Sequence, residues 1–291
     1  MEIEYFQSLV NVHNSRIEMK LDDFKAFVKK CTNLNKCDKN GEIIFRYVCQ
    51  YGSLDMLKCL IMESTNLNYL DCNGYQPIHF IANLGDNALE LVKLFMGKFI
   101  SNLGNNSDLM KLFISKFINS KNKRNVQPIH CACSQGDKAL ALVKYFIENG
   151  AEINCTDHMN RRPINYACIL GDKSIELVKY LISRGADLNC TDFKNRLPIH
   201  YACRLGDVSI GLVKYLTTNG ANINYVDKCG MQPIHYACHC GNGALETVKY
   251  LIMRGSNSNR ANLTGHKPID IACNVYYNSS ALVNYLNSLQ K

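Results

Sequence analysis

The sequence predicts an all-α fold: a solenoid of stacked helix-turn-helix units joined by β-hairpin-like turns. Two observations predict it. A phrase typified by Pro233-Ile234-His235-Tyr236-Ala237-Cys238 recurs along the chain, followed each time by apolar residues at helical spacing. The phrase also returns at a constant period, and a fixed period of this length indicates repeated units that pack only on their neighbours. Five of its prolines follow one another at intervals of 35 residues: Pro128, Pro163, Pro198, Pro233 and Pro268.

Residues 192–226 show what one period builds. A turn precedes Pro198, which suits the first position of a helix because the missing N–H of proline would have no partner there. Gly206 ends this short helix, and we expect Asp207 to cap a second helix of apolar periodicity. Gly220 can take the left-handed conformation that ends the second helix, and an extended segment leads to the next turn.

These units resemble the ankyrin repeat. Asp227-Lys228-Cys229-Gly230 and Pro233-Ile234-His235 match the turn and the helix start of that family, and Gly185-Ala186-Asp187-Leu188-Asn189 matches its closing segment. The resemblance covers about residues 38–291 in several copies, which makes it specific. The family repeat has about 33 residues, so most units here carry two more, placed between their helices. The resemblance implies a non-catalytic protein-protein interaction scaffold that binds a protein partner through the concave face of its units.

We expect two parts, an N-terminal capping helix pair over 1–37 and an ankyrin-repeat domain over 38–291 with about seven repeats, the last of them a polar C-terminal cap. A capping pair would shield the open end of the stack, as solenoids require. Apolar residues at helical spacing predict the two helices, the first with Ile3, Phe6, Leu9 and Val10 and the second with Leu21, Phe24, Phe27 and Val28.

An irregular stretch interrupts the period. Pro77 and Pro128 are 51 residues apart, 16 more than the usual interval, and the additional residues lie within 95–120. We expect a loop over 101–107, and then an additional or extended helix. Its apolar residues are Leu109, Leu112, Phe113 and Phe117. Two interpretations of this insertion stay open, a tolerated surface elaboration and a binding element.

Composition and charge narrow the class of protein. The chain has 291 residues, 47% of them hydrophobic, and no run of 18 apolar residues, so we expect no membrane-spanning helix. Its acidic first residues are unlike a secretory signal, and we expect a monomer of the cytoplasm or the nucleus. The net charge of +8 favours acidic partners over basic ones.

Fifteen cysteines would suggest disulfides in a secreted chain, but their placement indicates reduced thiols. Stacked helices lie about 8–10 Å apart, too far for a disulfide bond. Six cysteines occupy one position of the repeat, in the first helix: Cys49, Cys133, Cys168, Cys203, Cys238 and Cys273. The densest group of metal-ligating residue types, around Cys229 and His235, lacks the spacing of a known zinc site. We therefore expect no metal and no cofactor.

The recurring histidines invite a catalytic interpretation, but a structural one is better supported. They stand two residues after the repeat proline, in the first turn of a helix, at His79, His130, His200 and His235. Asn165 and Asp270 replace the histidine twice, and both can make similar hydrogen bonds. No serine or cysteine nucleophile accompanies the histidines at a recognisable spacing, so we expect no enzymatic activity.

The resemblance to the ankyrin family implies that the partner-binding surface comprises the turn tips and the exposed ends of the first helices. These positions differ between neighbouring units while the framework repeats, and they carry Arg, Met and Phe, residue types enriched in interfaces. We expect a protein partner with an acidic and apolar surface. The candidate residues are His158, Met159, Arg161, Ile169, Leu170, Phe193, Lys194, Arg196, Arg204, Leu205, Lys228, Met231 and His239.

A second surface supports an alternative function. A lysine followed by a tyrosine recurs in the second helices, as in Lys179-Tyr180, Lys214-Tyr215 and Lys249-Tyr250, and stacking would align these pairs as a Lys/Tyr ridge. A basic, aromatic ridge can bind nucleic acid or another acidic polymer. The same pattern is also typical of a solvated helix face, so we expect nucleic acid to be the less favoured partner.

Overall fold

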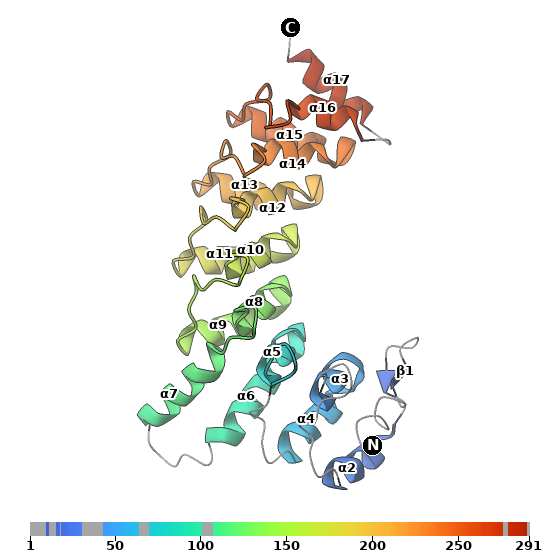
Figure 1. Ribbon diagram of the computed structural model, residues 1–291, viewed down its shortest axis with the longest axis vertical. Helices are drawn as coiled ribbons and strands as arrows, with labels where there is room; N and C mark the ends of the chain where they lie inside the picture. Colours follow the sequence, from blue (N-terminus) through green and yellow to red (C-terminus); the bar gives the residue numbers. More distant parts are fainter. Residues whose placement is uncertain are drawn as a thin grey trace. The chain divides into compact units, whose positions relative to one another are not determined.

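The structure is a computed structural model, and it describes residues 10–11, 16–17, 19–30, 43–63, 70–100, 107–275 and 279–289. Tertiary contacts group the chain into two compact units. The first comprises Met1–Ala132 and Lys138–Glu152, and the second comprises Cys133–Asp137 and Ile153–Lys291. Within each unit short helices pair, and successive pairs pack side by side (Figure 1). This confirms the expected all-α fold of repeated helical pairs.

The first half of the chain contains two very short strands and a series of helices. β1 and β2 pair in an antiparallel manner, with Val10 opposite Ile17. In chain order the elements are β1 (Val10–Asn11), β2 (Arg16–Ile17), α2 (Leu21–Lys30), α3 (Ile44–Tyr51), α4 (Leu54–Glu63), α5 (Pro77–Ala82), the 3₁₀ helix η1 (Gly85–Asn87), α6 (Ala88–Ile100), α7 (Ser107–Ile118), α8 (Pro128–Cys133), η2 (Gly136–Ala139) and α9 (Leu140–Glu148).

The second half is more regular. Each first helix begins at the repeat proline. From α10 (Pro163–Cys168) to α15 (Leu245–Met253), a 3₁₀ turn that starts at a glycine leads into the second helix, so the residues that lengthen these repeats lie in this turn. The elements are α10 (Pro163–Cys168), η3 (Gly171–Ser174), α11 (Ile175–Ser183), α12 (Pro198–Cys203), η4 (Gly206–Ser209), α13 (Ile210–Thr218), α14 (Pro233–Cys238), η5 (Gly241–Ala244), α15 (Leu245–Met253), α16 (Pro268–Cys273) and α17 (Ser280–Ser288).

One repeat illustrates how the core is built. Ile199 and Ala202 on α12 and Leu212, Val213 and Leu216 on α13 are all completely buried. The corresponding residues of neighbouring repeats are buried in the same way, so the core of each unit continues from repeat to repeat. The six-residue first helices are too short to be stable alone, and tertiary packing of their apolar faces must hold them.

The N-terminal region differs in part from the expected helix pair. α2 covers the second expected helix, with Asp22 and Asp23 in its first turn and Lys29 and Lys30 in its last, as the helix dipole favours. Val10, which we assigned to the first helix, lies instead in β1 and pairs with β2. The remaining residues of that predicted helix lie outside the described residues. The boundary between 1–37 and 38–291 stays a prediction.

The insertion is helical. α6 has 13 residues where α9 has nine, and α7 adds a further helix of 12 residues. Phe117 on α7 is buried and meets Phe95 on α6 edge to face, with ring centroids 5.6 Å apart. Leu112, by contrast, is 69% exposed. The insertion therefore packs on its own unit through one face of α7. Most of the expected loop over 101–107 lies outside the described residues, although Ser107 already belongs to α7.

The helix caps differ from the expected ones. We had expected Asp207 to cap α13, the second helix of its own repeat, and this prediction is wrong. Oδ1 of Asp207 instead accepts a hydrogen bond from the backbone N–H of Thr247 on α15 at 2.7 Å. Asp172 makes the equivalent contact with Leu212 on α13, also at 2.7 Å. Each of these side chains satisfies an N–H at the start of the following repeat's second helix, which ties neighbouring repeats together.

The recurring histidines are structural, as expected. Nδ1 accepts a hydrogen bond from the backbone N–H of the residue before the repeat proline, at 3.0–3.1 Å, in His79, His130, His200 and His235. Because Nδ1 accepts, Nε2 carries the proton, and in His79 it donates to the carbonyl of Val126 at 3.0 Å. Oδ1 of Asn165 accepts the same backbone hydrogen bond at 2.8 Å. Burial lowers the pKa of His79 and of His200 from 6.5 to about 4, so both are neutral at pH 7.

Candidate partner-binding surface

Each turn tip is closed by the side chain of its first residue. In the turn over 192–196, Oδ1 of Asp192 accepts hydrogen bonds from the backbone N–H groups of Lys194 and Arg196, both at 2.8 Å. Asn195 has a φ of 59°, the left-handed conformation that asparagine tolerates better than most residues. The preceding and following turns are closed by the same pair of aspartate hydrogen bonds. The tips are therefore rigid platforms for the side chains they carry.

Neighbouring turn tips are joined through the backbone. The N–H of Phe193 donates to the carbonyl of Met159 at 2.9 Å, and the N–H of Lys228 donates to the carbonyl of Lys194 at 2.9 Å. These hydrogen bonds hold the side chains of successive tips in a set order across the surface. All four of these residues were predicted from the sequence as partner contacts.

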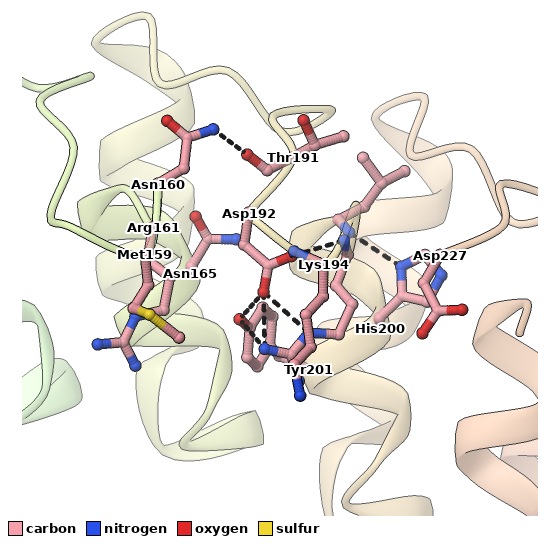
Figure 2. Close-up of polar contacts among 12 residues, drawn as sticks. Met159, Asn160, Arg161, Asn165, Thr191, Asp192, Lys194, His200, Tyr201 and Asp227 are labelled. Atoms are coloured by element: carbon pink, nitrogen blue, oxygen red, sulfur yellow. Dashed lines mark hydrogen bonds and ion pairs between the residues drawn. The ribbon is translucent and has the colours of Figure 1, made fainter. Parts of the chain in front are cut away.

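An arginine, an aspartate and a tyrosine form a closed group next to the turn over 192–196. Oδ2 of Asp192 accepts hydrogen bonds from Nε of Arg196 at 2.8 Å and from the hydroxyl of Tyr201 at 2.6 Å (Figure 2). The Arg196 guanidinium also lies 4.8 Å from the centroid of the Tyr201 ring. Burial opposes the charge of Asp192, but the hydrogen bonds from Tyr201, from the backbone of Arg196 and from its guanidinium outweigh it, so the pKa of Asp192 is lowered.

The preceding repeat carries the same group. Nε of Arg161 donates to Oδ2 of Asp157 at 2.9 Å, and the hydroxyl of Tyr166 donates to the same oxygen at 2.7 Å. The side chains of Arg161 and Arg196 are only 27% and 17% exposed, and their aspartate partners are completely buried. Both arginines were predicted as partner contacts. The structure pairs their guanidinium groups with buried carboxylates, which supports the turns that carry them, and their role as partner contacts stays a prediction.

The next repeat lacks the arginine. Met231 stands at its place, and the hydroxyl of Tyr236 still donates to Oδ2 of Asp227 at 2.6 Å. Met231 and His239 line a cavity of about 220 Å³. Its other lining residues are Asn262, His266, Ile271, Asn274 and Val275. Two of the predicted partner contacts thus lie together at one small cavity.

The most exposed aromatic side chain of this surface is Phe193, which is 39% exposed at its turn tip. Nζ of Lys194 lies 5.5 Å from the centroid of its ring, and Nζ of Lys228, from the next turn, lies 5.9 Å from it. Both ammonium groups are therefore within cation–π distance of the same ring. These three residues form the Phe193 patch.

The ends of the first helices contribute further residues. Ile169 is 41% exposed, and Arg204 and His239 are exposed on the next two helices. Burial lowers the pKa of His239, and the positive charge of Arg204 lowers it further. The predicted surface therefore continues from the turn tips onto the helix ends.

The predicted contacts fall into two groups by exposure. The exposed side chains are His158, Ile169, Phe193, Lys194, Arg204, Lys228 and His239. The half-buried side chains are Met159, Arg161, Leu170, Arg196, Leu205 and Met231. The exposed group is the one that a partner can contact without disturbing the framework of the repeats.

Sequence reasoning did not find the tyrosines that complete the buried groups. They are Tyr166, Tyr201 and Tyr236. Each follows the aspartate of its turn by nine residues in three successive repeats, and this regular spacing was the signal available in the sequence. Burial and the hydrogen bond to the aspartate raise the pKa of Tyr201 and of Tyr236, so both hydroxyls remain protonated donors at neutral pH.

The Lys/Tyr ridge is aligned in the described residues of the second unit, as the sequence predicts. Each lysine faces the tyrosine of the following repeat. The Nζ atoms of Lys179, Lys214 and Lys249 lie 5.8, 5.7 and 5.8 Å from the ring centroids of Tyr215, Tyr250 and Tyr285. Lys179 and Lys249 also form ion pairs with Glu176 and Glu246, at 2.8 and 2.9 Å. The lysines of the ridge are therefore already in contact with tyrosine or glutamate side chains of the protein itself.

The described part of the chain holds neither a metal-binding cluster nor a membrane-spanning helix. No group of three or more His, Cys, Asp or Glu side chains there is placed to hold a metal ion. Among the same residues, none of the helices has both the length and the apolar character needed to cross a bilayer. The cysteines of the repeated position form no disulfide bonds, and four of them, Cys133, Cys168, Cys203 and Cys238, are buried.

Comparison with known proteins identifies one family. The family model described as "Ankyrin repeats (3 copies)" matches residues 98–192, 172–262 and 199–289. The matches overlap and together span 98–289, about two thirds of the 291 residues. No curated protein matches the chain.

Proposed function

The chain belongs to the ankyrin-repeat family, and from that membership we propose that it is a non-catalytic scaffold that binds a protein partner through its second compact unit. Repeats of this family are generally protein–protein interaction modules and are typically non-enzymatic. The proposed surface consists of the turn tips over 157–161, 192–196 and 227–231 and of the exposed ends of α10, α12 and α14.

The Phe193 patch is the observation that carries the proposal. An aromatic ring on a rigid turn tip can enter a pocket of a partner at a small cost in conformational entropy, and aromatic side chains are enriched among the residues that dominate interface energies. Lys194 and Lys228 keep their ammonium groups beside this ring. A partner that presents an apolar pocket rimmed by carboxylates would complement both features at once.

The charge of the surface supports an acidic partner. The acidic residues of the three turns, Asp157, Asp192 and Asp227, are at most 6% exposed. Lys194, Arg204 and Lys228 are exposed on the same surface. The positive charges are therefore accessible, whereas the negative charges are internal.

An affinity capture from cell lysate tests the proposal. The surface variant is Phe193→Ser/Lys194→Gln/Lys228→Gln, which leaves Arg161 and Arg196 in place because their loss would uncover buried carboxylates. We expect this variant to lose the partner proteins that the wild type retains, while its melting temperature stays unchanged. Cross-linking through Lys194 and Lys228 in the wild-type complex would identify the proteins in direct contact.

A matched variant on the ridge, Lys179→Gln/Lys214→Gln, removes the same number of positive charges. We expect it to capture the same proteins as the wild type. If both variants lose the same proteins, the net charge of the chain carries the binding and the proposed surface is not specific. If neither variant loses any of them, the proposal is wrong.

The alternative partner, nucleic acid or another acidic polymer on the Lys/Tyr ridge, has a separate test. Such binding weakens steeply as salt rises, because counterions are released when lysines neutralise phosphates. We expect the wild type to show no such binding above 150 mM salt, given that the ridge lysines already contact glutamates and tyrosines. Nuclease-sensitive capture that only the ridge variant loses would favour the alternative.

A further inference from the structure

The first compact unit contains a cavity that the proposed surface does not include. Its volume is about 490 Å³, within the range of ligand sites. It is formed by α3, by α5 and the residues that follow it, and by two turn tips. The lining residues that matter for the argument are Arg46, Asn73, Tyr75, Phe80, Asn83 and Arg124.

Two substitutions within the repeat pattern open this cavity. Tyr75 stands at the place that Arg196 has in its repeat, and Phe80 stands at the place of Tyr201. Oδ1 of Asp71 still closes its turn, because it accepts the backbone N–H of Tyr75 at 2.7 Å. Oδ2 of Asp71 is buried and has no hydrogen-bond partner among the described residues. Among the described repeats that begin with aspartate, Asp157 and Asp192 have both an arginine and a tyrosine donor and Asp227 keeps the tyrosine, whereas Asp71 has neither.

A third substitution supplies the charge. Arg46 stands at the repeat position that is histidine in four later repeats. Its Nη1 lies 3.8 Å from Oδ2 of Asp71, whereas the arginine of the Arg196 group lies 2.7 Å from its aspartate oxygen. Its guanidinium carbon lies 5.9 Å from the centroid of the Phe80 ring. Arg46 is thus oriented towards the cavity by a long ion pair and a ring contact, and its side chain is 33% exposed.

The second cation comes from the next turn tip. Arg124 is exposed, and its guanidinium forms no ion pair within the described ranges. No acidic side chain is among the residues that line the cavity. Buried Asp71 offsets one of the two guanidinium charges, so the cavity keeps a positive charge. An anion is therefore the ligand that the charges favour, and two guanidinium forks suit a carboxylate.

The walls indicate what accompanies the anion. The rings of Tyr75 and Phe80 lie with centroids 5.6 Å apart and form an apolar wall. Asn73 and Asn83 also line the cavity, and the side-chain amide of Asn73 can bond to a peptide backbone. We propose that this cavity binds an acidic peptide segment of a partner protein, with a glutamate or aspartate carboxylate between Arg46 and Arg124 and an adjacent apolar side chain on Tyr75 and Phe80.

A peptide array tests this site on the full-length chain. The array holds octapeptides in which a central Glu, Gln or Lys is flanked by every other residue type. We expect the wild type to bind peptides with central Glu at least about tenfold more strongly than their Gln counterparts, since a charge-assisted bidentate contact is lost with the charge. We expect the strongest of these peptides to carry an aromatic or aliphatic residue beside the Glu.

Three variants decide whether the cavity is responsible. Arg124→Gln should abolish the preference for Glu, while the control Lys123→Gln removes the same charge one residue away and should keep it. Phe80→Tyr should place a hydroxyl near Oδ2 of Asp71, as the tyrosines of the other repeats do, so it should raise the melting temperature and weaken peptide binding. Melting temperatures of all variants show that each is folded.

Several outcomes would overturn the proposal. Equal binding of Glu and Gln peptides by the wild type would show that the cavity does not select a carboxylate. Equal behaviour of Arg124→Gln and Lys123→Gln would place the interaction outside the cavity. Binding of inorganic phosphate without any Glu peptide would identify a simple anion site. The residues tested here are separate from the Phe193 patch, so failure at this site would leave the proposed function of the second unit unaffected.

Discussion

Acid sensitivity of the buried histidines is the prediction that the structure supports most directly. His200 is completely buried, its Nδ1 accepts the N–H of Leu197 at 3.0 Å, and burial lowers its pKa from 6.5 to about 4. His79 in the first unit is also completely buried, and burial lowers its pKa to about 4 as well. At a pH between 6.5 and about 4, each of these histidines binds a proton in the unfolded chain but not in the folded one. The free energy of unfolding therefore falls as the pH is lowered from about 6.5 towards 4.

The size of the effect follows from the two pKa values. At pH 5 an unfolded histidine is almost fully protonated, whereas His200 in the folded protein is protonated in about one tenth of the molecules. The difference in proton binding between pH 7 and pH 5 lowers the free energy of unfolding by about 2 kcal/mol for each such histidine. Asp157 and Asp192 have lowered pKa values, so the stability they contribute is lost only further down in pH.

The chain itself suggests the variant that tests this. Asn165 occupies the same repeat position, is completely buried, and accepts the same backbone hydrogen bond without titrating. We expect His200→Asn to lose about 2 kcal/mol less than the wild type between pH 7 and pH 5, measured by urea unfolding followed by circular dichroism. The exposed His158→Asn is the control and should follow the wild type. If His200→Asn shows the same pH dependence as the wild type, the buried imidazole is not the source of the acid sensitivity.

Three further predictions concern stability and thiol chemistry. Gly206→Ala should destabilise the protein by several kcal/mol, and by more than Gly220→Ala. Both glycines have a positive φ, but only at Gly206 would the new Cβ lie 2.3 Å from a backbone oxygen. Equal shifts in the urea midpoint of the two variants would contradict this prediction. Arg196→Met should cost about 2 kcal/mol, less than a fully broken buried ion pair, because the tyrosine hydroxyl still bonds the aspartate; an unchanged melting temperature would show the ion pair to be dispensable. In the native protein the exposed thiol of Cys229 should react with a thiol reagent much faster than the thiol of Cys203, which is buried and whose pKa is raised by that burial. Mass spectrometry of the labelled peptides measures both rates, and equal rates would contradict the burial of Cys203.

The repeated helical pairs could be predicted from the sequence because their causes are local. A proline at the start of each first helix, a glycine at its end and apolar residues at helical spacing act within a few residues of one another. The same holds for the turns, whose Asp192 and Asn195 supply the side-chain hydrogen bond and the left-handed backbone that the turn needs. The period then repeated this local information often enough to identify the family.

The candidate site was predicted only in outline. The exposed positions, including Phe193 and Lys228, differ from repeat to repeat, and that variation indicated the surface. The sequence did not reveal that lysines from two different repeats lie within cation–π distance of the Phe193 ring, because that arrangement depends on how the turn tips stack. Nor did it reveal that Arg196 serves the framework, since the tyrosine that completes its group lies on the following helix.

The sequence by itself therefore determined the fold class, the repeat period, the family and the structural role of the histidines. Tertiary structure alone decided which repeat each polar side chain serves, as with Asp207, which caps the second helix of the following repeat. It also decided that Arg46, Tyr75 and Phe80, from two different repeats, meet at one cavity. The physical reason is that hydrogen bonds and ion pairs between repeats join residues about 30 to 40 positions apart, at distances set by packing and not by local preference.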